Sequence, residues 1–174
     1  MDRVFPVVTW GDEQVTFRPV ETGRSVSGAI GAALVFAFYE MRLVLADIQG
    51  RGWCVPGGRL EPGEAASTAA RREAWEECGA ALGPLLPLGY TVALLLDNTE
   101  RTLAVSYAAT VIRLDAIPPE SESRGIRLAA PEDLPGCYYR WDELMAAMFD
   151  CAWEHRHTLA AETCAGSSVF PLDC

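Results

Sequence analysis

Residues 58–80 read GRLEPGEAASTAARREAWEECGA, and the rest of the chain is interpreted around this stretch. It holds five Glu and three Arg, and Glu73, Glu76 and Glu77 lie at offsets of three and four near its end. If residues 65–78 are helical, this spacing places the three carboxylates on one face, because positions three and four apart are neighbours on a helix. Like charges on one face repel each other unless a cation lies among them. The stretch therefore predicts an acidic helix face that holds a cation.

The residues around this stretch indicate where the helix begins and ends. Four glycines and a proline in residues 50–58 predict a loop before it. Gly79 suits the left-handed backbone conformation just past a helix end, so the helix is expected to stop there. Ala70, Ala74 and Cys78 recur every four residues on a strip beside the acidic face. Their small side chains would let the helix pack closely against a sheet.

Upstream of the acidic helix, runs of β-branched and apolar residues predict strands. Residues 4–20 hold two such runs on either side of the turn-prone residues 11–13, which predicts a hairpin or a pair of edge strands. Residues 28–38 and 42–48 are near-continuous apolar runs and predict two central strands joined by a tight turn. The pattern alone leaves a buried helix open for this pair.

Downstream, strand, loop and helix patterns follow one another. They are a hairpin of residues 82–96 and 102–112, a polar loop of residues 115–125 with three acids, a short apolar run at 126–128, a turn at 131–136 and a second helix at 141–154. Residues 158–174 show weak periodicity and are left unassigned. No internal repeat or domain-scale linker interrupts the chain, so residues 1–174 are interpreted as one domain, with N-terminal strands in residues 1–27.

Length and charge exclude several classes of partner. A chain of 174 residues can bury a real core, and its 14 Lys and Arg against 24 Asp and Glu give a formal net charge of −10. This charge opposes attraction to a nucleic-acid backbone or an anionic membrane, so neither a long nucleic acid nor a membrane is expected. The first residues show no secretory pattern, and six scattered cysteines are typical of reduced thiols in a cytoplasmic protein.

The acidic stretch resembles the Nudix box, G-x5-E-x7-R-E-U-x-E-E-x-G-U, at every charged and glycine position. The two positions marked U, usually bulky aliphatic residues, are Ala74 and Ala80 here. The preceding Trp53, Pro56 and Gly57 also resemble the lead-in to that box. The matching charged and glycine positions are Gly58, Glu64, Arg72, Glu73, Glu76, Glu77 and Gly79.

The resemblance implies a fold and a reaction. Nudix proteins are α/β, an α/β/α sandwich around a mixed β-sheet, and hydrolyse the pyrophosphate bond of a nucleoside diphosphate linked to another moiety. The substrate would be a nucleotide, a nucleotide-sugar or a dinucleotide. By position, the metal ligands would be Glu73, Glu76 and Glu77, with the backbone carbonyl of Gly57 as a further one. Clustered hard oxygen ligands select Mg²⁺ or Mn²⁺ over zinc or copper.

The general base is left open by the resemblance. In some relatives it is the glutamate that corresponds to Glu73, and in others it is an acid on a distant loop. Glu120 and Glu122 of the polar loop are the candidates for the second arrangement. Glu122 is preferred because it directly precedes the short apolar run, although either could be a solvated loop acid.

Two further box residues are expected to position others. Arg72 is a candidate catalytic residue that could hold the carboxylate of Glu76 four positions later, the alternative being a surface ion pair worth little. Glu64 corresponds to the first glutamate of the box, which braces the loop more often than it takes part in chemistry.

Other candidate sites are weaker. One cluster could bind zinc, although its spacing fits no usual motif and a buried thiol beside partly exposed histidines is preferred: Cys151, His155, His157 and Cys164. Four aromatic residues could stack on a base, although packing is the favoured role for each: Tyr90, Tyr138, Tyr139 and Trp141. Trp75 is expected to point away from the carboxylate face.

Two other functions were weighed against the hydrolase. A non-catalytic Nudix module would sense a nucleotide, but such modules usually lose box carboxylates and this chain keeps them all. RNA decapping would need a basic stripe, which a chain with a net charge of −10 lacks. Specificity is expected to depend on residues 1–27, 83–100 and 115–140, because such folds vary their loops. The sequence leaves a homodimer open.

Overall fold

The computed structural model describes residues 3–20, 29–97 and 99–165, and only the backbone of residues 160–165. The strands in these ranges are β1 (Val8–Trp10), β2 (Glu13–Pro19), β3 (Ala32–Tyr39), β4 (Arg42–Ile48), β5 (Gly52–Cys54), β6 (Gly57–Arg59), β7 (Ala80–Leu94), β8 (Glu100–Leu114) and β9 (Ser123–Ala129). The helices are α1 (Ala66–Cys78), α2 (Leu134–Cys137) and α3 (Glu143–Ala165), with a 3₁₀ turn at Pro131–Asp133.

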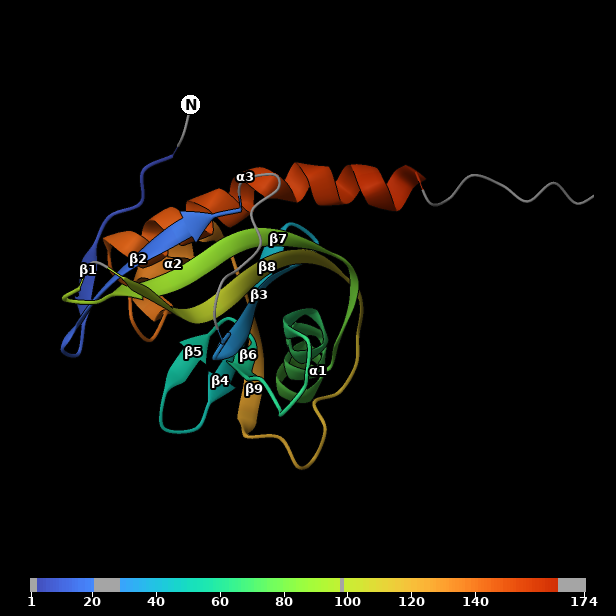
Figure 1. Ribbon diagram of the computed structural model, residues 1–174. Helices are drawn as coiled ribbons and strands as arrows, with labels where there is room; N and C mark the ends of the chain where they lie inside the picture. Colours follow the sequence, from blue (N-terminus) through green and yellow to red (C-terminus); the bar gives the residue numbers. More distant parts are fainter. Residues whose placement is uncertain (1–2, 21–28, 98, 166–174) are drawn as a thin grey trace, which may run out of the picture.

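The strands of the described residues belong to one mixed sheet. Their order is β1-β2-β7-β8-β3-β4-β5, with β6 paired to β3 and β9 paired to β4. Strands β3 and β8 run parallel, and the other strand pairs are antiparallel. Helix α1 lies on one side of the sheet and α3 crosses the other side (Figure 1). This arrangement confirms the expected α/β/α sandwich around a mixed sheet.

The two long helices meet the sheet through different kinds of side chain. On α1 the buried strip consists of small residues with no exposed surface, namely Ala69, Ala70, Ala74 and Cys78. Such side chains let α1 approach the sheet closely, as its sequence predicts. Helix α3 packs instead through aromatic rings, with Phe149 5.0 Å from Phe36 and Trp153 5.8 Å from Phe38 between ring centroids.

The predicted hairpins are present. Strands β1 and β2 pair around Gly11, and β7 and β8 form the long third hairpin. The turn between β3 and β4 uses Glu40 and Met41, both with positive φ, at 46° and 64°. Two consecutive left-handed residues give the tight turn whose twist suits a two-residue hairpin loop. The alternative of a buried helix over these two apolar runs is therefore wrong.

The prediction of a loop over residues 50–58 is wrong in part, because β5 and β6 lie within it. Strand β6 pairs with β3, and a Cβ atom added to Gly57 would lie only 2.5 Å from the Ala33 carbonyl oxygen. The glycine that suggested a loop here permits a close approach of two backbones. Local composition could not show this, because the partner strand lies far away in the sequence.

Other element boundaries also differ from the predictions. Helix α3 runs to Ala165, so residues 158–165 are helical, while residues 166–174 lie outside the described part. Strand β9 begins at Ser123, inside the predicted polar loop, because it pairs with β4 over most of the length of both strands. Strand β7 starts at Ala80, directly after the end of α1, and the predicted turn of residues 131–136 contains the 3₁₀ turn and most of α2.

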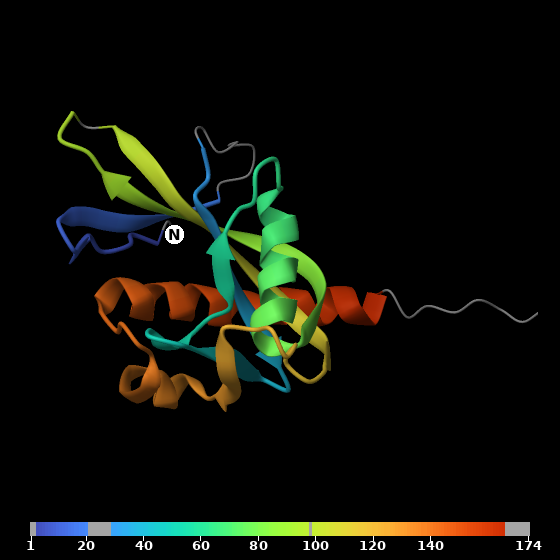
Figure 2. The same cartoon turned by 90° about the horizontal axis from the view of Figure 1, so that it is seen from below.

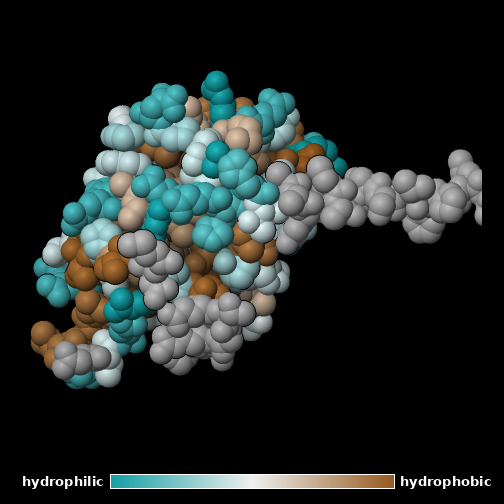
Figure 3. All heavy atoms as spheres, turned by 90° about the horizontal axis from the view of Figure 1, so that it is seen from above, coloured by the Kyte–Doolittle hydropathy of each residue, from teal (hydrophilic) through white to brown (hydrophobic). Residues whose placement is uncertain are grey.

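The views from opposite sides show what surrounds the helices. From below, α1 stands in front of the sheet, and the connection between β8 and β9 passes one end of it (Figure 2). From above, hydrophilic side chains cover much of the face that carries α3, with apolar ones between them (Figure 3). No helix in the described ranges has the length and apolarity needed to cross a bilayer.

Candidate active site

The acidic face of α1 forms part of a cleft of about 740 Å³. Its other walls are β6, the turn between β4 and β5, and the loop between β8 and β9. The charged residues that line it are five acids, Glu73, Glu76, Glu77, Glu120 and Glu122, and two cations, Arg51 and Arg59. The structure thus brings the three predicted metal ligands and both candidate loop acids to one cavity. Gly57 and Gly58 also line it.

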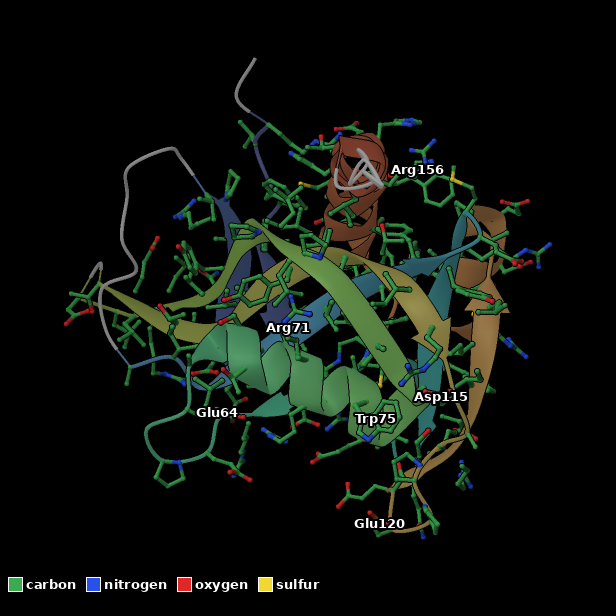
Figure 4. All side chains as sticks on the ribbon, turned by 90° about the vertical axis from the view of Figure 1, so that its right-hand side faces the viewer. Glu64, Arg71, Trp75, Asp115, Glu120 and Arg156 are labelled. Carbon is green, nitrogen blue, oxygen red and sulfur yellow. The ribbon has the colours of Figure 1, made fainter. Side chains whose placement is uncertain are left out.

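The end of α1 is fixed by Gly79, which has the predicted left-handed conformation with φ of 64°. Its N–H donates to carbonyl oxygens of the last helical turn. A Cβ atom at this position would lie 2.3 Å from the carbonyl oxygen of Asp115, so the loop that leads to Glu120 and Glu122 passes against the helix end. Figure 4 shows Glu120 on that loop, near the C-terminal end of α1, with Trp75 on the outward face of the helix. Trp75 is 40% exposed, as expected for a residue outside the carboxylate face.

Glu77 is the most enclosed of the three helix acids. Its Oε2 atom accepts a hydrogen bond of 3.0 Å from the backbone N–H of Gly57. Burial raises the pKa of Glu77 to about 7, and the charges of Glu73 and Glu122 add to this, while the Gly57 N–H and Arg51 oppose it. A carboxylate in this position is poorly solvated and lies among like charges, which is the environment that a bound cation would relieve.

Glu73 lies directly against the glycine pair. A Cβ atom added to Gly58 would be 2.2 Å from the Oε1 atom of Glu73, so only glycine leaves room for this carboxylate. The same Oε1 atom accepts a hydrogen bond of 2.8 Å from Arg72. Burial raises the pKa of Glu73, although Arg72 opposes the shift. The glycine in the first box position therefore has a steric reason that involves a candidate metal ligand.

Arg72 connects the loop before α1 to the acidic face. Its guanidinium donates two hydrogen bonds of 2.9 Å to Glu64, one to each carboxylate oxygen, and others to Glu73 and to the Arg59 carbonyl. The predicted contact with Glu76 is present at 3.1 Å, but the two-pronged pair with Glu64 is the closer one. This geometry places Arg72 between the acids rather than free in the cleft.

Glu64 ties the start of the loop to this network. Its Oε2 atom accepts a hydrogen bond of 2.9 Å from the Glu61 backbone N–H. The hydrogen bonds from Arg72 and from that N–H lower the pKa of Glu64 to about 2. These contacts are those of a residue that braces the loop, as the resemblance implied, and Glu64 does not line the cleft.

The carboxylates of Glu73, Glu76 and Glu77 suit a hard divalent cation, although they do not converge on one point. In the described part of the chain, no three His, Cys, Asp or Glu side chains converge as ligands of one ion. Glu73 and Glu76 each take a hydrogen bond from Arg72, and Glu77 takes one from Gly57. All three nevertheless line the same cleft, and oxygen donors of this kind suit Mg²⁺ or Mn²⁺.

The other predicted candidates lie elsewhere. Tyr138 is 9% exposed and packs on Phe149, while Tyr90 and Trp141 pack against the core, so none of the three faces the cleft. The Nδ1 atom of His155 lies 2.7 Å from the Cys151 carbonyl oxygen, an ordinary contact within a helix. The Cys164 side chain is outside the described residues.

The sequence reasoning did not identify Arg51 and Arg59 as site residues. Arg51 lies in the glycine-rich segment before the box, Arg59 is the second residue of the box, and both line the cleft. The available signal was that each is a cation close in sequence to the predicted acidic site. Tyr139, named only as a stacking candidate, is 43% exposed and lies beside Arg51.

Comparison with known proteins agrees with this architecture. The sequence matches the NUDIX domain family over residues 30–150. A comparison with curated protein sequences finds no match. Among solved structures, the chain resembles a pyrophosphohydrolase of Bacillus subtilis, with a TM-score of 0.65 and 23% identity over 84% of this chain and 92% of that one.

Two further structures with similar folds come from other organisms. An Ap4A hydrolase of C. elegans gives a TM-score of 0.53 and 18% identity over 75% of this chain and 98% of that one. An ADP-ribose pyrophosphatase from Streptococcus suis gives a TM-score of 0.53 and 15% identity over 72% and 90%. At these identities the likeness concerns the fold.

Proposed function

The chain belongs to the Nudix family, and on this premise we propose that it is a Mg²⁺-dependent hydrolase of the pyrophosphate bond in a nucleoside diphosphate linked to another moiety. Membership of the family confirms the expected enzyme class, a pyrophosphohydrolase, at the level of the family. The observation that carries the proposal is the cleft itself. It brings the three acids of α1, two loop acids and two arginines around one space large enough for a nucleotide-sized ligand.

Glu73, Glu76 and Glu77 would hold the divalent cation, with the Gly57 carbonyl as a further ligand. When bound, Mg²⁺ would neutralise charge on phosphate oxygens and lower the pKa of a water molecule. Gly58 supports this role because it leaves room for the Glu73 carboxylate. Arg72 and Glu64 would fix the loop and hold Glu73 and Glu76 in orientation, as residues that support metal ligands commonly do.

Glu122 is the proposed general base, which takes the proton of the attacking water. Its side chain makes no hydrogen bond or ion pair within the described residues, so its carboxylate is free to accept a proton. Glu122 is also close enough to Glu77 for its charge to help raise the pKa of that residue. Glu73 is the alternative base, but its Oε1 atom is already engaged by Arg72.

A panel of nucleotides, nucleotide-sugars and dinucleotides, incubated with Mg²⁺ and analysed for released products, tests the proposal. We expect at least one compound to be split at a phosphoanhydride, with activity lost on chelation and restored by Mg²⁺ or Mn²⁺. The products also identify the attacked phosphorus. Binding of a nucleotide without any cleavage across the panel would contradict the hydrolase and support the non-catalytic sensing module.

A further inference from the structure

Arg51 lines an acidic cleft but has no ion-pair partner among the described residues, whereas six other arginines there form ion pairs. The arginines that form ion pairs in those ranges are Arg3, Arg18, Arg72, Arg101, Arg113 and Arg124. Arg51 lines a cleft with five acids, yet none of the carboxylates in the described ranges lies within 4.0 Å of its guanidinium. Apart from its side-chain hydrogen bond with Cys54, the guanidinium therefore keeps donors available for an anion from outside.

The position of Arg51 is supported by Tyr139 and Cys54. Its guanidinium lies 5.9 Å from the ring centroid of Tyr139 and beside the thiol of Cys54. Tyr139 is fixed in turn by a hydrogen bond of 2.9 Å from its backbone N–H to the Trp53 carbonyl oxygen. Gly52, with φ of 103°, leaves the adjoining backbone close to Tyr139, since an added Cβ would lie 3.6 Å from that of the tyrosine.

From this arrangement we infer that Arg51 is the residue that binds the phosphate of the substrate and that Tyr139 holds it in place. The inference deepens the proposed function and rests on it. A guanidinium offers a planar fork of donors that matches two phosphate oxygens, and its contact with an aromatic face pre-orients that fork. A group that is already ordered loses less freedom on binding.

Arg59, the other cation of the cleft, lacks this support. Its carbonyl oxygen accepts a hydrogen bond from Arg72, but its exposed side chain has no hydrogen bond or ring contact in the part of the chain that the structure describes. It can add positive charge to the cleft without fixing a direction. Arg51 therefore determines where a phosphate lies among the five acids.

Kinetics of an Arg51→Gln variant test this role. Loss of a charge-assisted contact is expected to raise KM by about 10-fold to 100-fold with little change in kcat. Arg51→Lys keeps the charge but loses the fork, so its KM should fall between those of Gln and wild type. Arg124→Gln is the matched control, because Arg124 is exposed, pairs with Asp47 and lies outside the cleft. An equal rise in KM in the control would overturn the inference in favour of a general charge effect.

Variants of Tyr139 test whether its ring holds Arg51 in place. Tyr139→Leu should raise KM by a smaller factor than the loss of Arg51, and Tyr139→Phe, which keeps the ring, should restore the wild-type value. Combined with Arg51→Gln, the Tyr139→Leu change should add nothing further, because the ring acts through the arginine. If the effects of Arg51→Gln and Tyr139→Leu on KM were fully additive, Tyr139 would not act through Arg51.

Binding of inorganic pyrophosphate with Mg²⁺, measured by calorimetry, separates this inference from the proposed hydrolysis. We expect wild type and Arg124→Gln to bind it alike, and Arg51→Gln to bind it about 10-fold to 100-fold more weakly. Equal binding by Arg51→Gln would overturn the role of Arg51 even if nucleotides are hydrolysed. If pyrophosphate binding depends on Arg51 but no nucleotide is hydrolysed, the phosphate site is supported and the proposed reaction is contradicted.

Discussion

Glu77→Gln is expected to lower kcat/KM by about 10³-fold or more. The substitution replaces the most enclosed acid of the α1 face and keeps its shape, so the loss would come from weaker binding of the cation. A catalytic ion contributes several kcal/mol of charge stabilisation in the transition state, and each 1.4 kcal/mol is a factor of about ten in rate. Steady-state kinetics at one fixed Mg²⁺ concentration, just sufficient to saturate wild type, measure this loss with the substrate found in the panel.

The same variant is expected to be more stable than wild type when metal is removed. Burial disfavours the charged form of Glu77 and raises its pKa to about 7, so above that pH the folded state carries an unfavourable charge. Glutamine removes the charge and can still accept the hydrogen bond from Gly57. In chelator at pH 8, Tm should rise by about 2–4 °C for each kcal/mol gained. Higher stability with lower activity is the pattern of a functional residue that opposes folding.

Glu61→Gln is the control for both measurements. Glu61 lies in the same segment, but its side chain is exposed and outside the cleft, so activity and Tm should stay near their wild-type values. A Glu77→Gln enzyme with unchanged turnover would remove Glu77 from the metal site. A lower Tm in chelator would show that the carboxylate stabilises the fold instead.

Glu122→Gln is expected to lower kcat by about 10²-fold to 10⁴-fold with KM little changed, the usual range for loss of a general base. The reason is that the amide cannot take the proton from water, while the ligands on α1 stay intact. Glu120→Gln, which alters another acid of the same loop and cleft, should change kcat only slightly.

A larger loss of kcat in Glu73→Gln than in Glu122→Gln would contradict the assignment of Glu122 as the general base. If Glu122→Gln stays close to wild type while Glu73→Gln loses its turnover, the base is Glu73. Metal affinity separates the two roles, because Glu73→Gln should weaken metal binding and Glu122→Gln should not. Measuring both quantities on each variant therefore distinguishes a ligand from a base.

The box could be predicted from sequence because its signals are local. Glu73, Glu76 and Glu77 share a face through helical spacing alone, and Gly79 marks the helix end through its conformational freedom. The structure has α1 at Ala66–Cys78 with Gly79 in the left-handed region, close to the predicted 65–78. The long strands β3, β4, β7 and β8 were also recognisable, because their apolar runs are long.

What the sequence did not reveal depends on contacts between distant segments. Strand β6 exists because Gly57 pairs with Leu34, and β9 exists because it pairs with β4. Neither pairing can be recognised from the local amino-acid composition. Gly50 does lie in a turn, as predicted, but Gly57 and Gly58 allow the close approach of a backbone and of a side chain.

The same limit applies to the site. Arg72 was expected to hold Glu76, four residues on, because only helical neighbours can be paired from spacing. It donates two hydrogen bonds to Glu64, which the loop before α1 brings back toward the helix, and only one to Glu76. Arg51 was missed because its neighbours in the cleft, such as Glu77 and Glu122, lie far from it in the sequence.

The central claim is that the acidic face of α1 is a site for a divalent cation. Calorimetric titration of metal-free protein with Mn²⁺, without nucleotide, tests it most directly when wild type and Glu77→Gln are compared. We predict that wild type binds Mn²⁺ and that Glu77→Gln binds it at least about tenfold more weakly. Equal affinity in the two proteins, or no binding to wild type, would contradict the claim.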